Sequence, residues 1–189
     1  MDPRYLASMA QLRQHLGSAD DRARPDSRYS RAMQIRGARL EDVEPIAQLW
    51  YDGWQDAHAD LVPMALTKLR TRDSFPPRVA KRLAQTWVAM DDAGALVGFF
   101  MLDDTELYQF YVAAAARGTG AAQILMDAAE DALRADGVAE AHLGCAIGND
   151  RAARFYEKTG WKKAGVIADM VETTAGPFKL EVWRYEKVL

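Results

Sequence analysis

Residues 112–122 read VAAAARGTGAA and join a strand-like run to a long amphipathic helix. Gly118 and Gly120 leave backbone N–H groups uncovered at the start of that helix. Unpaired N–H donors and the helix dipole together favour a bound diphosphate at such a position. The sequence therefore predicts a site for a phosphate-bearing cofactor.

Two other phosphate-binding motifs fit this stretch poorly. A P-loop needs a Lys after its last glycine, and Ala121 follows Gly120. A dinucleotide-binding fingerprint that begins at Gly118 would place Gln123 where close helix–strand packing requires a small residue. A nucleotide-binding protein is kept as an alternative, which predicts that ATP or NAD stabilises the fold and that CoA does not.

The same stretch resembles the pyrophosphate-binding loop of the GCN5-related N-acetyltransferases (GNAT family). The family pattern Q/R-x-x-G-x-G/A is matched by Arg117, Gly120 and Ala122. A second family signature consists of an Asn, a helix with a Phe-Tyr-Glu-Lys core and a closing Gly–aromatic pair. It is present downstream as Asn149, residues 155–158, Gly160 and Trp161. The resemblance covers residues 33–188 in organisation, and its specific motifs occupy residues 106–161.

Length and composition set the frame for this interpretation. A chain of 189 residues with 49% hydrophobic residues can bury one good core and is too short for two ordinary domains. The net charge of −3 argues against a nucleic-acid-binding protein and suits cationic amine substrates. A single cysteine, Cys145, and the absence of a long apolar run predict a cytoplasmic protein without a membrane partner.

The first 30 residues differ from the rest of the chain. Apolar residues at helical spacing predict a short helix, and residues 17–27 have the composition of a polar linker. The apolar positions are Tyr5, Met9, Leu12 and Leu16. We therefore predict an N-terminal extension over residues 1–30 and an N-acetyltransferase domain over residues 31–189.

The hydrophobic pattern from residue 31 onward alternates between strands and helices. Strands are predicted at 33–36, 86–90, 95–102, 105–112, 140–147, 166–171 and 178–188. Helices are predicted from residue 41 or 42, between Pro63 and Pro76, at 78–85, from the glycine loop to Gly137, and from Asn149 to Gly160. This order agrees with the α/β (α+β) fold that the resemblance implies, a mixed and mostly antiparallel sheet flanked by helices, with two splayed parallel strands at its centre.

The resemblance implies acetyl-CoA as cosubstrate, with the pantetheine arm between strands 105–112 and 140–147. Unpaired strand amides would bind the pantetheine, and the N–H of Val112 would face the thioester oxygen, where negative charge grows during transfer. The implied cofactor-binding residues are Tyr111, Val112, Arg117, Gly118, Thr119, Gly120, Ala121, Ala122, Asn149 and Tyr156. Several of them also have a structural interpretation, as core, turn or helix cap. Alanines at 113–116 replace a proline that the family often carries before this loop.

Two residues are predicted to move protons. An alkyl ammonium has no lone pair for attack, so a base is needed, and the resemblance places Glu106 in that role. Asp103 and Asp104 are the alternatives. The phenol of Tyr156 would protonate the departing thiolate, or it packs on a helix face with a structural partner.

Residues on the first helix and after it are implied to form the acceptor pocket, although helical spacing also fits a core position for Trp54. They are Tyr51, Trp54, Asp56 and His58. No metal is predicted, because His142 and His15 lack metal-ligand spacing with other His or Cys residues.

The resemblance therefore implies that the protein is an N-acetyltransferase in which a small-molecule or peptide amine attacks acetyl-CoA directly. The alternative is an acyl-CoA-binding regulatory module without transferase activity. A homodimer is compatible with either function.

Overall fold

The computed structural model describes residues 33–189, so the predicted N-terminal helix and linker lie outside the described residues. The strands are β1 (Gln34–Gly37), β2 (Thr86–Met90), β3 (Leu96–Asp103), β4 (Glu106–Val112), β5 (Glu140–Ala146), β6 (Lys162–Thr173) and β7 (Gly176–Val188). The α-helices are α2 (Val43–His58), α3 (Met64–Leu69), α4 (Pro76–Lys81), α5 (Ala121–Ala135) and α6 (Asp150–Lys158). In this part of the chain no helix is both long and apolar enough to cross a membrane.

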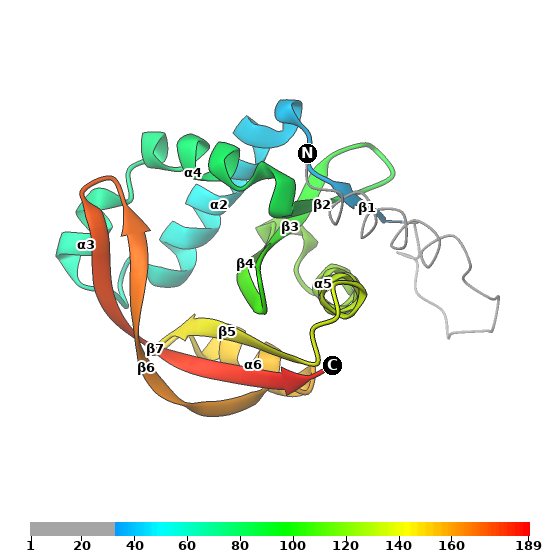
Figure 1. Cartoon of the computed structure of the whole chain (residues 1–189). Helices are drawn as coiled ribbons and strands as arrows, with labels where there is room; N and C mark the ends of the chain where they lie inside the picture. The colour runs from blue at the N-terminus through cyan, green and yellow to red at the C-terminus, as the bar shows by residue number, and fades with distance from the viewer. Residues whose placement is uncertain (1–32) are drawn as a thin grey trace.

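One sheet with strand order β1-β2-β3-β4-β5-β7-β6 runs through the protein (Figure 1). Every neighbouring pair is antiparallel except β4 and β5. These two parallel strands pair only where Glu106 faces His142, and they separate beyond that point. The predicted mixed, mostly antiparallel sheet with a splayed central pair is therefore confirmed.

The two faces of the sheet carry two separate hydrophobic cores. Phe100 and Leu102 of β3 pack in the core beneath α5 and α6, whereas Phe99 and Met101 pack in the core beneath α2 and α4. This alternation follows from the two-residue period of a strand. Because β3 is buried on both faces, its sequence is a continuous apolar run.

The helix α2 begins as the charge pattern predicts. A 3-10 turn, Leu40–Asp42, precedes it, and Pro45 lies within its first turn, where a missing N–H costs no hydrogen bond. Asp42 accepts two hydrogen bonds from the Arg36 guanidinium, at 2.6 and 2.9 Å. These bonds hold the pKa of Asp42 below its usual range, and they join the start of α2 to β1.

Several elements differ from the predicted boundaries, among them α4 and β6. The helix expected at 78–85 begins earlier, at Pro76, because a proline at the first helical position is already set for helix geometry, and it ends at Lys81. Strand β6 runs over 162–173 instead of 166–171. It is an edge strand exposed on both faces along most of its length, so its ends carry no apolar alternation, and its pairing with β7 defines it.

Buried Glu130 of α5 links three elements. Its carboxylate accepts hydrogen bonds from the Trp161 indole at 3.1 Å and from Lys187 of β7 at 2.6 Å. We expect Glu130→Ala to lower the free energy of unfolding by about 2 kcal/mol, because it leaves the buried Trp161 indole N–H without an acceptor. It also leaves the half-buried Lys187 ammonium with only the Thr159 carbonyl, at 2.7 Å. Urea denaturation would measure the change. Asp131→Ala, which removes only an exposed pair with Arg134, should cost less than about 0.5 kcal/mol. An equal loss of unfolding free energy in the two variants would contradict the stabilising role of Glu130.

Candidate active site

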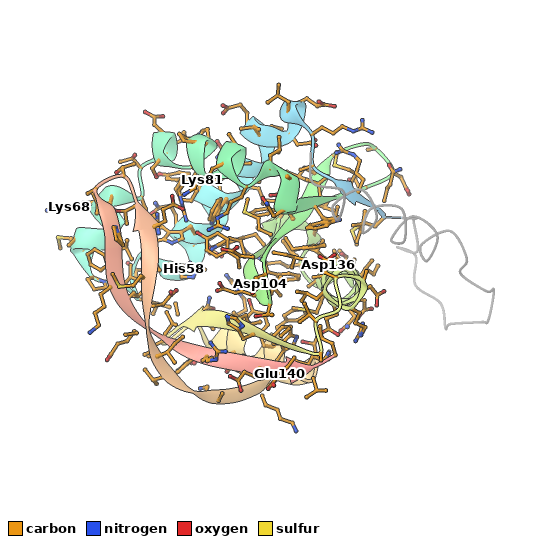
Figure 2. All side chains as sticks on the ribbon, in the orientation of Figure 1. His58, Lys68, Lys81, Asp104, Asp136 and Glu140 are labelled. Atoms are coloured by element: carbon orange, nitrogen blue, oxygen red, sulfur yellow. The ribbon has the colours of Figure 1, made fainter. Side chains whose placement is uncertain are left out.

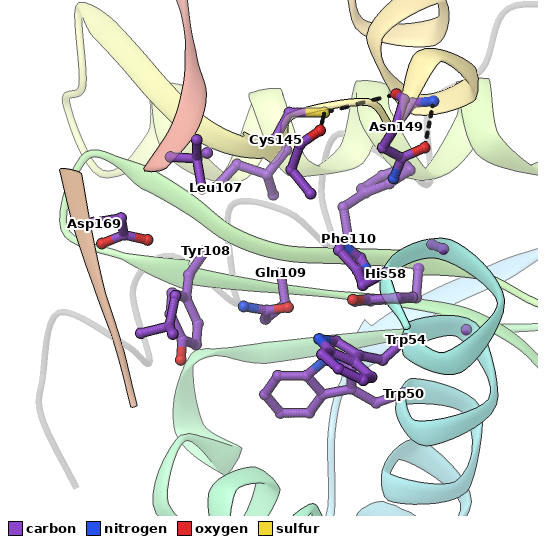
Figure 3. A pocket seen from close by; sticks show the side chains of 18 of the residues that line it. Trp50, Trp54, His58, Leu107, Tyr108, Gln109, Phe110, Cys145, Asn149 and Asp169 are labelled. Atoms are coloured by element: carbon purple, nitrogen blue, oxygen red, sulfur yellow. Dashed lines mark hydrogen bonds between the residues drawn. The ribbon is translucent and has the colours of Figure 1, made fainter. Parts of the chain in front are cut away.

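A cavity of about 640 Å³ lies where β4 and β5 separate. It is lined by β4 and β5, by α2 and α6, by the β6–β7 hairpin and by the loop that follows β4. Figure 3 shows Trp50 and Trp54 of α2 across this cavity from Cys145 and Asn149. The cavity has the size of a small-molecule site.

The backbone of β4 presents hydrogen-bonding groups to this cavity. The Ala113 N–H donates to the Val97 carbonyl at 2.9 Å, and Val112 stands opposite Gly98. In an antiparallel ladder the hydrogen-bonded and non-hydrogen-bonded pairs alternate, so the N–H of Val112 faces away from β3. It points toward β5, which does not pair with β4 at that position. The predicted donor at Val112 is thus directed into the gap between the strands.

The glycine loop has the geometry of an anion cradle. Gly118 has φ +77° and Gly120 has φ +92°, values that L side chains rarely adopt. A Cβ atom at either position would meet no other heavy atom, so the space in front of the loop is open. Gly120 is the N-cap of α5 and supplies no side-chain acceptor, while the Thr119 hydroxyl accepts the Ala121 N–H at a long 3.4 Å. The loop therefore fits a diphosphate at the N-terminus of α5.

Arg117 and Asp56 meet at this end of the cavity. The Asp56 carboxylate pairs with Arg117 at 2.9 Å and with Arg151 of α6 at 2.6 Å. The Arg151 hydrogen bond is the main reason that the pKa of Asp56 lies below its usual range. Asp56, predicted in the acceptor pocket, thus lies beside the glycine loop and lines a second, smaller cavity together with His58.

Of the other predicted acceptor residues, Trp54 and His58 line the main cavity and Tyr51 does not. Tyr51 packs against Phe75 instead. Trp54 is buried and stacks on the His58 ring with centroids 5.7 Å apart. Burial lowers the pKa of His58 to about 4, so its ring is neutral near pH 7. Gly53 allows this close approach of α2 to β4, because a Cβ there would lie 2.6 Å from the Tyr111 ring.

Glu106 has the properties of a general base. Burial, followed by the negative charges of Asp169 and Asp103, raises its pKa to about 7. Asp103 also lines the cavity, but its carboxylate is bound to Arg82 at 2.7 Å. Asp104 lies in the β3–β4 turn with φ +54° (Figure 2). It is not among the residues that line the cavity. Among the three carboxylates that the sequence offered, Glu106 alone lines the cavity without an ion pair to any arginine that the structure describes.

Tyr156 and Asn149 line the cavity from the side of α6. Burial raises the pKa of Tyr156 above its usual range, so the phenol keeps its proton at neutral pH. Asn149 is the N-cap of α6, and its side-chain oxygen accepts the Ala152 N–H at 3.2 Å. Its capping role is therefore present in the structure, alongside its position on the cavity wall.

The charged residues on the cavity wall that the sequence did not point to include Arg70, Arg78, Arg82 and Asp169. The arginines belong to the irregular α3–α4 region and Asp169 to the edge strand β6, where no motif marks them. A cluster of arginines within residues 70–82 is visible in the sequence, but its direction is set only by the fold. Across residues 33–189, no three His, Cys, Asp or Glu side chains are grouped so that they could hold a metal ion.

Comparison with known proteins gives the family. The model of the acetyltransferase (GNAT) family matches residues 43–161, which is more than half of the chain. This protein belongs to the GNAT family, as its glycine loop and second signature predict. A curated relative, the uncharacterized N-acetyltransferase YuaI of Bacillus subtilis, is 26% identical over 102 residues. The match covers 49% of this chain and 59% of YuaI.

Solved structures support the fold. A GCN5-related N-acetyltransferase from Rhodopseudomonas palustris has a TM-score of 0.66 at 21% identity, over 84% of this chain and 96% of that one. The PaiA N-acetyltransferase of Thermoplasma acidophilum, in complex with coenzyme A, has a TM-score of 0.61 at 18% identity, over 84% and 99%. YncA of Salmonella typhimurium, a putative acetyltransferase with acetyl-CoA bound, has a TM-score of 0.62 at 18% identity, over 84% and 94%.

Proposed function

We propose that this protein transfers an acetyl group from acetyl-CoA to a primary amine. The observation that carries the proposal is the separation of β4 from β5, which leaves the Val112 N–H and the Glu106 carboxyl facing one cavity that continues to the glycine loop. Family membership and two neighbours that contain CoA or acetyl-CoA support the same cosubstrate. The N-terminus of α5 would hold its diphosphate, and the open edge of β4 its pantetheine amides.

Each residue then has one task in the transfer. Acetyl-CoA supplies the acetyl group as a thioester. Glu106, directly or through water, accepts the proton of the ammonium so that the amine nitrogen can attack. The N–H of Val112 donates a hydrogen bond where negative charge grows on the carbonyl oxygen. Tyr156 donates its proton to the leaving sulfur.

The proposal is tested by mixing the protein with acetyl-CoA and a panel of amines. The panel contains amino acids, a polyamine and a lysine peptide. We expect release of free CoA thiol that depends on the amine, with an acetylated product detected by mass spectrometry. If CoA binds and no amine yields product, the chain is a cofactor-binding module and the proposal is wrong.

Tyr156→Phe tests the proton donor. We expect the turnover number to fall by about 10- to 100-fold, with little change in the dissociation constant of acetyl-CoA, because the ring is kept and only the hydroxyl is lost. Tyr185→Phe is the matched control. Its ring packs against Tyr156 with centroids 5.8 Å apart, its hydroxyl binds Glu157, and it does not line the cavity. Unchanged turnover in Tyr156→Phe would remove this residue from the mechanism.

A further inference from the structure

Two arginines stand at the α3–α4 end of the cavity without a carboxylate partner. Arg70 is only 4% exposed, and its Nη1 donates to the backbone carbonyl of Glu172 at 2.6 Å. The Arg78 guanidinium lies 4.0 Å from the centre of the Trp50 ring, and its Nε and Nη1 atoms are buried without an acceptor. Within residues 33–189, neither arginine forms an ion pair.

The nearby acidic side chains are already engaged or lie elsewhere on the wall. The Glu172 carboxylate is held by Lys81 of α4 at 2.6 Å, and Asp103 is held by Arg82 at 2.7 Å. Figure 2 shows Lys81 on α4, near the end of the β6–β7 hairpin. Arg70 is buried, Arg78 is half-buried, and the charge of each acts on the other. Two such cations without a counterion are costly to the folded protein, and an anion that binds between them relieves that cost.

Negatively charged side chains lie near Glu106, the proposed base. Glu106 and Asp169 both line the cavity, and Asp169 of β6 forms no ion pair in the described part of the chain. The negative charge of Asp169 acts on Glu106, so the two carboxyls are neighbours. The cavity wall therefore offers carboxylates for an ammonium and guanidinium groups for an anion.

We propose that the acceptor is a small amine that also carries an anionic group, a carboxylate or a phosphonate, and that Arg70 and Arg78 bind this group. The inference rests on the proposed acetyl transfer and narrows its substrate. It departs from the cationic substrates that the net charge of the chain favours, because the local charge of the cavity differs from the average. A planar guanidinium can form two parallel hydrogen bonds to either oxyanion.

The acceptor is small because the arginine end of the cavity is closed. The Arg70–Glu172 hydrogen bond and the Lys81–Glu172 ion pair tie the α3–α4 region to the β6–β7 hairpin. The Gln55 side chain of α2 donates to the Arg70 carbonyl at 3.3 Å and fixes the same corner. A continuous peptide would have to break these contacts to pass between Arg70 and the hairpin, whereas a free amino acid would not.

The first test compares amines that differ only in charge. Glycine, β-alanine, γ-aminobutyrate and aminomethylphosphonate are each assayed against their uncharged amide or ester, with rates corrected for the fraction of free amine. We expect kcat/KM to be about 10- to 100-fold higher for the anionic member of the best pair, the worth of one charge-assisted hydrogen bond. The chain-length series reports the spacing between the two charges, and the phosphonate distinguishes the two kinds of oxyanion. Equal or faster transfer to the uncharged members would overturn the inference.

The second test removes one guanidinium. Arg78→Gln should lower kcat/KM for the anionic amine about 10- to 100-fold and that for its amide much less, whereas a merely structural role would lower both alike. Arg72→Gln is the matched control, since Arg72 is an exposed neighbour that lies over Tyr51 and does not line the cavity. Arg70→Lys serves as the second variant, because it retains the charge and loses the paired geometry. An equal loss for both members of a pair in Arg78→Gln contradicts the assignment.

Calorimetry on the CoA-saturated protein separates this inference from the proposed function. Binding of the acids in preference to their amides, without any transfer, would keep the inference and remove the proposed activity. Transfer to uncharged amines alone would keep the activity and remove the inference. Equal binding of acids and amides, or binding of neither, contradicts the inference.

Discussion

Replacement of Glu106 by Gln is expected to lower kcat by about 100- to 10,000-fold while acetyl-CoA binds as before. The amide keeps the shape and the hydrogen-bonding capacity of the carboxyl, but it cannot accept the proton of the ammonium. Stopped assays of CoA release would measure the rate, and calorimetry the cosubstrate affinity. Asp104→Asn is the matched control, because this neighbouring carboxylate does not line the cavity. An equal effect of the two substitutions would contradict the role of Glu106.

The pH dependence gives a second measure of the same residue. Burial and two nearby carboxylates raise the pKa of Glu106 to about 7, and a base acts only when it is deprotonated. Activity of the unmodified enzyme should therefore rise with pH through about 7. In Glu106→Gln this step should disappear, while the step that belongs to deprotonation of the amine substrate remains. A step near pH 7 that persists in the variant would assign it to another group.

Stability provides the check that the variant is folded. Because the folded-state pKa of Glu106 lies above its usual value, ionisation of this carboxyl opposes folding once the pH exceeds the unfolded value. The protonated carboxyl contributes its whole share of the free energy of unfolding at low pH, and this share is lost as the pH rises through about 7. Glu106→Gln should thus be at least as stable as the unmodified protein at a pH above about 8, and a lost rate there would be chemical.

The fold could be predicted from the sequence because its signals are local. The glycine loop, the two caps around α6 and the continuous apolar run of β3 each depend on neighbouring residues. The prediction was less accurate where pairing decides the structure. β6 extends beyond its apolar residues because β7 lies beside it along the whole length.

The candidate site also has one part that local sequence predicts and one part that it does not. The glycine loop and α5 lie where the pattern indicates, since they form one continuous segment. The acceptor end is built from α2, the α3–α4 region and β6, which are distant in the sequence. Spacing on α2 alone could not show that Asp56 pairs with Arg117 and Arg151, or that Tyr51 packs on Phe75 outside the cavity. Nor could it show that Arg70 and Arg78 point inward, because a hydrogen bond to the Glu172 carbonyl holds Arg70 and stacking on Trp50 holds Arg78.

Replacement of a glycine in the loop before α5 should have the second large effect, on the affinity for CoA. The chain also offers a matched control glycine. Gly118 in the loop and Gly94 in the β2–β3 turn both have φ +77°, and a Cβ at either position meets no other atom. Substitution by Val forces a β-branched residue to a φ of +77° in both places, at a cost of about 1 to 3 kcal/mol. The two variants should therefore be destabilised alike, which thermal denaturation would measure.

Their affinity for CoA should differ. In Gly118→Val the new side chain stands in the open space before α5, blocks the approach of the diphosphate and removes hydrogen bonds to a charged group. We expect the dissociation constant of CoA to rise by about 10- to 100-fold in Gly118→Val and to stay unchanged in Gly94→Val. Calorimetry below the melting temperature of both variants would make the measurement. If the two variants bind CoA equally well, the N-terminus of α5 does not hold the diphosphate, and the proposed orientation of the cosubstrate between β4 and β5 fails with it.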